Sequence, residues 1–77
     1  PQSSPEEKLI ADQEKQQLLQ IINQLPKDYR EVIHDHYFSE ISYREISAKL
    51  GLSERTVETR IYRARKMIKE LWRKHAL

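Results

Sequence analysis

The sequence predicts a small all-α domain of four helices, and three observations lead to this fold class. The chain has 77 residues, the size of one domain near the lower limit for independent folding. Apolar residues recur at the three- and four-residue spacing of amphipathic helices, and no segment shows the alternation of a strand. Without cysteine, neither disulfides nor a zinc finger are available, so the packing of helices must supply the stability.

The first helix is expected from about Pro5 to Gln24. Ser4 can cap its start, proline suits the first helical position, and two acidic residues follow at the positive end of the helix dipole. Residues 1–4 are predicted to be disordered or the end of a linker, and residues 5–77 to form the domain. Because the chain does not begin with methionine, we expect it to be a piece of a larger protein. The apolar side of this helix consists of Leu9, Ile10, Leu18, Leu19, Ile22 and Leu25.

Pro26 ends the first helix and opens a second one, which is expected to end near Ser39. A short connection then leads to Ser42. The residues that recur at helical spacing in this second helix are Tyr29, Val32, Ile33, His36 and Tyr37.

Residues 42–67 are predicted to form a helix-turn-helix. The third helix starts at Ser42, with Glu45 at the position that completes a capping box. Gly51 stands where the chain must leave this helix in a left-handed conformation, and Ser53 can cap a fourth helix. Two helices joined by a short turn containing glycine, the second one basic outside and apolar inside, make this motif. The predicted fold is therefore a small four-helix domain with a C-terminal helix-turn-helix.

The fourth helix has two contrasting sides. Its apolar stripe consists of Val57, Ile61, Ala64, Ile68 and Leu71. The side chains that point away from this stripe include Arg55, Thr59, Tyr62, Arg63 and Lys66.

The positive charge of the chain is concentrated on this last helix. Residues 54–77 carry eight basic and three acidic side chains, a net charge of +5, whereas the rest of the chain is negative. Such a distribution is expected of a helix that lies beside phosphates, although a solvated helix face gives the same pattern. Combined with the helix-turn-helix, the charge favours nucleic acid as the partner.

Several other functions are not supported by the sequence. No apolar run is long enough for a membrane span and the N-terminus lacks the features of a signal peptide, so an intracellular, cytoplasmic protein is expected. Adjacent residues in His34-Asp35-His36 point about 100° apart on a helix, so we predict no metal site and place His36 at the core edge beside Tyr37. Nothing arranges serine, histidine and aspartate as a catalytic set, so neither enzymatic activity nor a cofactor is expected. Trp72 is predicted to cover the bottom of the core, the alternative being an exposed anchor for a protein partner.

Most of the chain resembles region 4 of bacterial sigma factors, and the extracytoplasmic-function branch in particular. The resemblance is carried by LPKDYREVI, at residues 25–33, and by HYFSEISYREISAKLGLSERTVETRIYRARKMIKEL, at residues 36–71. It implies a last helix that recognises the minus-35 promoter element in the major groove. It also implies other helices that hold the flap of the RNA polymerase beta subunit, and an anti-sigma factor that blocks many members of the family.

Carried over by position, the resemblance places Glu58, Thr59, Tyr62 and Arg63 against bases or the floor of the groove. Arg63 can bond bidentately to guanine, a contact worth about 1–3 kcal/mol of discrimination. Glu58 departs from the basic residue expected at its position, and could accept a hydrogen bond from a cytosine amine or repel phosphate. Ser47 stands where alanine is usual and is still small enough for close helix approach.

Contacts to the DNA backbone are expected from side chains beside the groove-facing residues and from the start of the third helix. Arg60 and Arg65 flank the apolar stripe, and could instead pair with acidic residues inside the domain. The expected backbone contacts are Tyr43, Arg44, Ser53, Arg55, Arg60, Arg65 and Lys66.

Two alternatives to a sigma factor domain stay open at this point. One is the DNA-binding output domain of a two-component or quorum-type (LuxR-like) activator, which has a similar four-helix arrangement. The other is a helical bundle that binds only proteins, with its charges merely solvated. For a sigma factor domain, the expected partners are double-stranded promoter DNA, RNA polymerase core through its beta flap, and an anti-sigma factor.

Overall fold

The computed structural model describes the backbone of residues 5–76 and the side chains of residues 13–74. The helices in this range are α1 (Pro5–Asn23), α2 (Lys27–Ile33), α3 (Tyr43–Leu50) and α4 (Glu54–Ala76), with a π-helical turn, η1 (His34–Phe38), after α2. The predicted all-α fold with four helices is confirmed. The expectation of a disordered segment at residues 1–4, and the Ser4 cap, lie outside the described residues, as do the side chains of Leu9 and Ile10.

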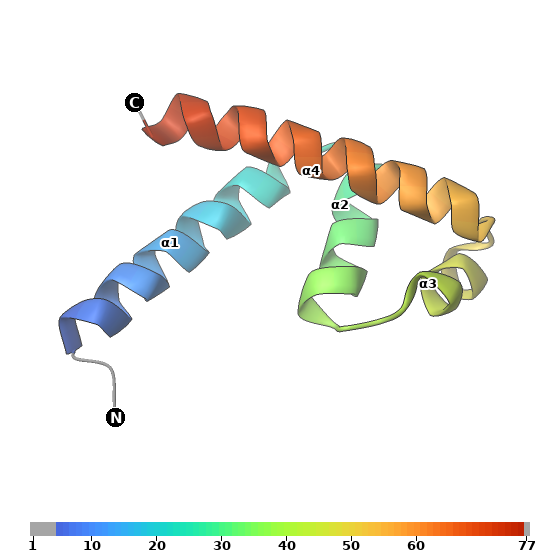
Figure 1. The fold of residues 1–77 in the computed structure, drawn as a ribbon, viewed down its shortest axis with the longest axis horizontal. Coiled ribbons are helices and arrows are strands. Elements are labelled where there is room, and N and C mark those ends of the chain that lie inside the picture. The colour runs from blue at the N-terminus through green and yellow to red at the C-terminus, as the bar shows by residue number, and fades with distance from the viewer. Residues whose placement is uncertain (1–4, 77) are drawn as a thin grey trace.

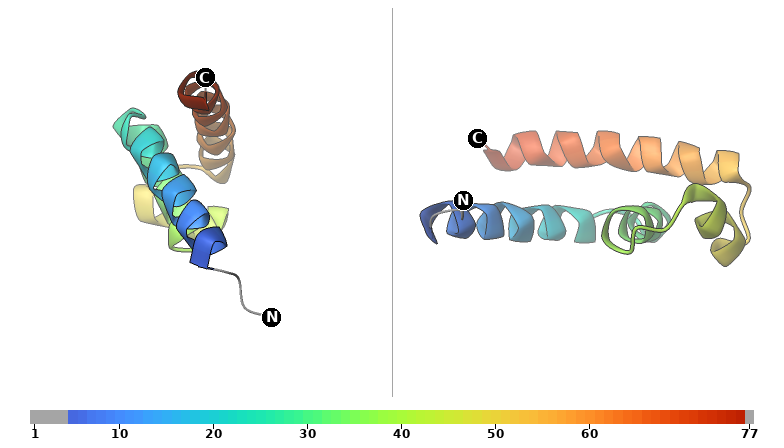
Figure 2. Two further views of the ribbon diagram at one scale, coloured as in Figure 1. Left: turned by 90° about the vertical axis from the view of Figure 1, so that its left-hand side faces the viewer. Right: turned by 60° about the horizontal axis from the view of Figure 1, so that its bottom comes forward.

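The long helix α4 runs the length of the molecule, and the other elements pack along one side of it (Figure 1). α1 runs obliquely in the opposite direction and meets α4 near its own C-terminal end, α2 lies under the middle of α4, and α3 lies near the N-terminal end of α4 (Figure 1 and Figure 2). The molecule is flat, with extents of 43 × 31 × 15 Å. One side of α4 is therefore left as surface.

The core lies where α4 meets α1, α2 and α3. Burying these aliphatic side chains stabilises the fold by about 25 cal/mol for each Å² of apolar surface removed from water. Val57, Ile61 and Ala64 of the predicted α4 stripe are fully buried, which confirms the stripe, and Ile68 and Leu71 pack at its edge. Ile21 of α1 is also buried, although the predicted apolar side of this helix did not include it. The remaining members of the buried cluster are Ile22, Leu25, Val32, Ile33 and Ile46.

The second predicted helix is continuous to Phe38 but changes type along its length. Its last turn is wider than an α-helical turn, with the Ser39 N–H donating to the His34 carbonyl at 3.1 Å. The Tyr37 ring, expected on the apolar side, is 48% exposed. The change of helix type thus turns Tyr37 and Phe38 outward while Asp35 is kept inside.

The helix-turn-helix has the predicted start, turn and restart. The Glu45 N–H donates to the Ser42 hydroxyl oxygen at 3.2 Å, which is half of the expected capping box. Gly51 has a φ of 68°, the left-handed conformation that ends α3. Ser53 caps α4 by accepting a hydrogen bond from the Thr56 N–H at 3.1 Å.

Candidate nucleic-acid interface

The outward side of α4 carries the side chains that the sequence pointed to. Thr59, Arg63 and Lys66 are exposed, as predicted, and Tyr62 keeps 61% of its surface. These side chains are available because the core lies on the other side of α4, where α1, α2 and α3 pack, although Thr59 and Arg63 also border the start of α2. The geometry therefore presents one continuous, basic helix surface of the width that a DNA major groove accepts.

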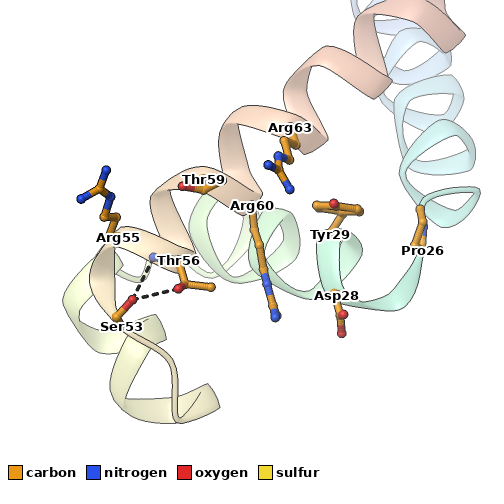
Figure 3. A pocket seen from close by; sticks show the side chains of 9 residues that line it. All are labelled: Pro26, Asp28, Tyr29, Ser53, Arg55, Thr56, Thr59, Arg60 and Arg63. Carbon is orange, nitrogen blue, oxygen red and sulfur yellow. Dashed lines mark hydrogen bonds between the residues drawn. The ribbon is translucent and has the colours of Figure 1, made fainter.

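An open pocket of 510 Å³ lies between the N-terminal half of α4 and the start of α2. Figure 3 shows Arg60 and Arg63 extending from α4 toward Tyr29 and Asp28 of α2, while Arg55 extends in a different direction. Ser53 and Thr56 close one end of the pocket, where their hydroxyl groups are 2.8 Å apart. Arginines and hydroxyl groups around an open hollow are suited to phosphate oxygens.

Glu58, an acidic residue on the outward side of α4, lies beside this pocket. Glu58 is exposed and lines a shallow hollow of 250 Å³ together with Arg55, Thr59 and Tyr62. The hollow is formed by side chains one turn apart on the same side of α4, so a base edge could contact several of them at once. Tyr62 is in contact with Lys66, whose Nζ lies 5.5 Å from the ring centroid.

The start of α3 offers a second, smaller set of predicted backbone contacts. Arg44 is exposed, and its carbonyl accepts a hydrogen bond from the Ser47 hydroxyl at 2.7 Å. Tyr43 is half-buried, with its ring centroid 4.7 Å from that of His36. Tyr43 thus also belongs to the packing of α3 against η1.

Arg60 and Arg65 lie on opposite flanks of the apolar stripe, because five residues of helix correspond to about 140° of rotation. Arg60 lines the pocket beside α2, with the other arginines. Arg65 instead lines a groove on the far flank. Neither arginine has a carboxylate within ion-pair distance in the described part of the chain, so the internal pairing considered for them is not observed.

The groove beside Arg65 is largely apolar. It has a volume of 470 Å³, lies between α1, η1 and α4, and includes the exposed rings of Tyr37 and Phe38. Trp72 is half-buried and lines a shallow extension of the groove with Leu18, so it is neither fully in the core nor fully exposed. Such a groove leaves the Tyr37 and Phe38 rings in contact with water and can accept apolar side chains of another protein.

One part of the site, and one contact that positions the helix-turn-helix, were not found by sequence reasoning. Tyr29 and Asp28 were not expected at the pocket, because α2 was considered only for its packing side. The ion pair between Lys49 Nζ and Asp35 Oδ1, at 2.9 Å, joins the end of α3 to η1 across fourteen residues of sequence. Helical periodicity gives no signal for such a distant contact.

His36 lies at the core edge beside Tyr37, as predicted, with the two ring centroids 4.9 Å apart. Its Nδ1 is hydrogen-bonded to the Ile41 carbonyl at 3.1 Å. The side chains that the structure describes contain no group of three metal-binding residues close enough to hold an ion. Among the described residues, no helix is both long and apolar enough to cross a membrane.

Comparison with known proteins gives a family for this chain. Residues 15–68 match the family described as Sigma-70, region 4. The chain is 33% identical over 58 residues to the ECF RNA polymerase sigma factor SigM of Bacillus subtilis (strain 168), covering 75% of this chain and 36% of the relative. It is 35% identical over 65 residues to the RNA polymerase sigma-H factor of Pseudomonas aeruginosa, covering 84% of this chain and 34% of the relative.

A third relative is the probable RNA polymerase sigma factor RfaY of Xanthomonas campestris pv. campestris. It is 32% identical over 69 residues, which cover 90% of this chain and 17% of the relative. The chain thus spans 36% or less of the length of each of these three relatives. The match sets aside the activator-type alternative, and the resemblance drawn from the sequence is confirmed. The chain belongs to the sigma-70 region 4 family.

Proposed function

We propose that this chain is the promoter-recognition domain of an extracytoplasmic-function sigma factor, and that α4 enters the major groove at the minus-35 element. The observation that carries the proposal is the exposed basic surface of α4, which is open to solvent on one side of a flat molecule and is bordered by the start of α2 along its N-terminal half. In a helix-turn-helix, the second helix lies in the major groove with its N-terminal residues at the bases. The role is one of binding in the cytoplasm and includes no catalytic step.

Four residues of α4 are proposed to contact bases. Arg63 is suited to a bidentate contact with guanine, and Tyr62 and Thr59 to apolar contact with a thymine methyl group. Glu58 lies in the same exposed hollow as Thr59 and Tyr62, where its carboxylate can accept a hydrogen bond from a cytosine amine. The acidic charge at this position would add preference rather than affinity, because the carboxylate is repelled by the acceptor atoms of other base edges, and by the phosphates of every duplex.

The remaining predicted contacts are proposed to go to phosphates and to fix the helix in the groove. Arg55 and Arg60, with the hydroxyl of Ser53, line the pocket at the N-terminal half of α4 and are the best placed. Arg44 and Tyr43 are proposed to contact the backbone from the start of α3. Lys66, farther along α4, would contact it at the edge of the interface. Arg65 is proposed to reach a phosphate from the far flank, where it also lines the apolar groove.

A second surface is proposed for RNA polymerase. The apolar groove between α1, η1 and α4 exposes the Phe38 ring and lies on the flank of α4 opposite the arginine-lined pocket. DNA and a protein partner could therefore bind at the same time. We propose that the flap of the beta subunit docks in this groove, and that an anti-sigma factor would act by covering either surface.

Selection of binding sites from random duplexes, with the chain bound to polymerase core, tests the proposal. We expect one preferred sequence for the parent chain, and for Arg63→Ala a loss of about 1–3 kcal/mol of preference at one base pair. Arg73→Ala is the matched control, because it removes the same charge from an exposed position ten residues, or about 15 Å, farther along the helix. If neither chain preferred any sequence, the groove assignment would be wrong.

The salt dependence of duplex binding separates this proposal from a bundle that binds only proteins. Each phosphate neutralised by a lysine or arginine contributes about −0.9 to the slope of log affinity against log salt concentration. Several phosphate contacts therefore predict affinity that falls steeply with salt. A helical bundle that binds only proteins would show no saturable binding to the duplex at any salt concentration.

A further inference from the structure

Lys66 and Tyr62 contact each other on the outward side of α4. The Lys66 ammonium lies over the Tyr62 ring, 5.5 Å from its centroid. Residues four apart stand one above the other on a helix, and their side chains lean toward its N-terminus. A lysine at this spacing therefore reaches back over the ring, where the electron-rich face attracts its charge.

Little else restrains the Tyr62 ring. It is 61% exposed, and it does not pack against the hydrophobic core. A long side chain on a helix can adopt two χ1 rotamers, and fixing one of them on binding costs conformational entropy. A contact that already holds the ring in the free protein lowers this cost.

Lys66 also has a different partner within its reach. Glu70 follows four residues later, at a spacing that allows an ion pair on a helix. The ion pairs found among residues 13–74 do not include Lys66, and its ammonium lies over Tyr62 instead. In the structure, the Lys66 ammonium is therefore in contact with the Tyr62 ring and not paired with Glu70.

We propose that Lys66 is a positioning residue for Tyr62, and that through this ring it sets the preference at the one base pair that Tyr62 faces. The inference rests on the proposed function, and it adds to Lys66 a role that a phosphate contact does not have. A lysine that only neutralised a phosphate would strengthen binding to every duplex alike. A lysine that holds the ring in place changes the preference among bases at one position.

The test measures the affinity of the chain for its selected duplex and for the three duplexes changed at the base pair where Tyr62→Ala loses preference. We expect Lys66→Met to lower the preference there about two- to five-fold, the size of an exposed cation–π contact. Lys66→Arg keeps a cation over the ring and should retain the preference. Lys69→Met removes the same charge from an exposed position of the same helix, beside the apolar groove, and should leave the preference among the four duplexes unchanged.

The double variant isolates the contact. In a Tyr62→Ala chain, Lys66→Met should cause no further loss of preference, because the ring that it positions is gone. If Lys66→Met lowered the affinity for all four duplexes by one factor and left the preference intact, the inference would be wrong while the proposed function stood. A parent chain without sequence preference would overturn both.

An NMR measurement on the free chain gives an independent readout. Protons over the face of an aromatic ring are shifted upfield, so the ε-methylene protons of Lys66 should resonate upfield of those of Lys27, an exposed lysine that pairs with Glu31. Tyr62→Ala should remove this difference. Equal shifts for the two lysines in the parent chain would show that the ring is not held, and would contradict the inference.

Discussion

Two single residues set the backbone path around α3. Gly51, at its end, has a φ of 68°, and Glu40, before its start, has a φ of 54°. Residues with a Cβ adopt this left-handed region at a cost of about 1–2 kcal/mol, whereas glycine does so freely. Gly51 thus fits its position, and Glu40 carries a strain that the surrounding contacts must offset.

Gly51→Ala is expected to lower the free energy of unfolding by about 1 kcal/mol. The cost is conformational, because a Cβ built at this position meets no atom within 4 Å. Urea unfolding of both chains measures it. Gly51→Asn is the control, since asparagine tolerates this conformation better, and its loss should be smaller. An alanine variant as stable as the parent would show that the turn does not require the left-handed conformation.

At the scale of elements, the helix-turn-helix is held to the rest of the domain by polar contacts as well as by its core. Lys49 in the last turn of α3 pairs with Asp35 of η1. Only 8% of the Asp35 surface is exposed. The Ile41 N–H donates to the Asp35 carbonyl at 3.0 Å, and His36 bonds to the Ile41 carbonyl. The π-helical turn therefore holds Ile41, just before α3, and Lys49, in the last turn of α3.

Lys49→Met is expected to lower the free energy of unfolding by about 1–3 kcal/mol, because it leaves the nearly buried Asp35 carboxylate without its partner. Thermal or urea unfolding at neutral pH measures the loss. Lys27→Met is the matched control, since Lys27 pairs with Glu31 at 3.9 Å on the surface and should cost less than about 1 kcal/mol. Equal losses for both variants would contradict a special role for the contact with η1.

The helix boundaries around the motif were predictable because their signals are local. Ser42, Gly51 and Ser53 act through backbone atoms within a few residues, and each has the predicted role. The π-helical turn was not predictable, because its residues recur at the spacing of an α-helix. The pairing of Asp35 with Lys49 depends on how η1 packs against α3, which periodicity does not contain.

At the scale of the whole molecule, α4 divides two surfaces. Its arginine-lined pocket faces α2, and its apolar groove faces α1 and η1. The sequence showed that Arg60 and Arg65 flank the apolar stripe of α4, but not which helix would lie beside each arginine. That assignment depends on the positions of α1 and α2 along α4, so the apolar groove at Arg65 was not foreseen.

The two surfaces are expected to be separable by substitution. Phe38→Ser should weaken binding to polymerase core and leave duplex affinity within about two-fold of the parent, because Phe38 lines the apolar groove and not the arginine-lined pocket. Its ring is already 40% exposed, so the domain should stay folded. Pull-down with polymerase core and a duplex titration measure the two effects. A parallel loss of both affinities would contradict two independent surfaces.

The most direct test of α4 as the groove-binding helix is an NMR titration of the isotope-labelled chain with its selected duplex. We expect the largest amide shift changes at Thr59, Tyr62 and Arg63, with little change at Phe38 and Ile68 in the apolar groove. Shift changes confined to Phe38 and Ile68, with the outward side of α4 unaffected, would contradict the placement of this helix in the DNA groove.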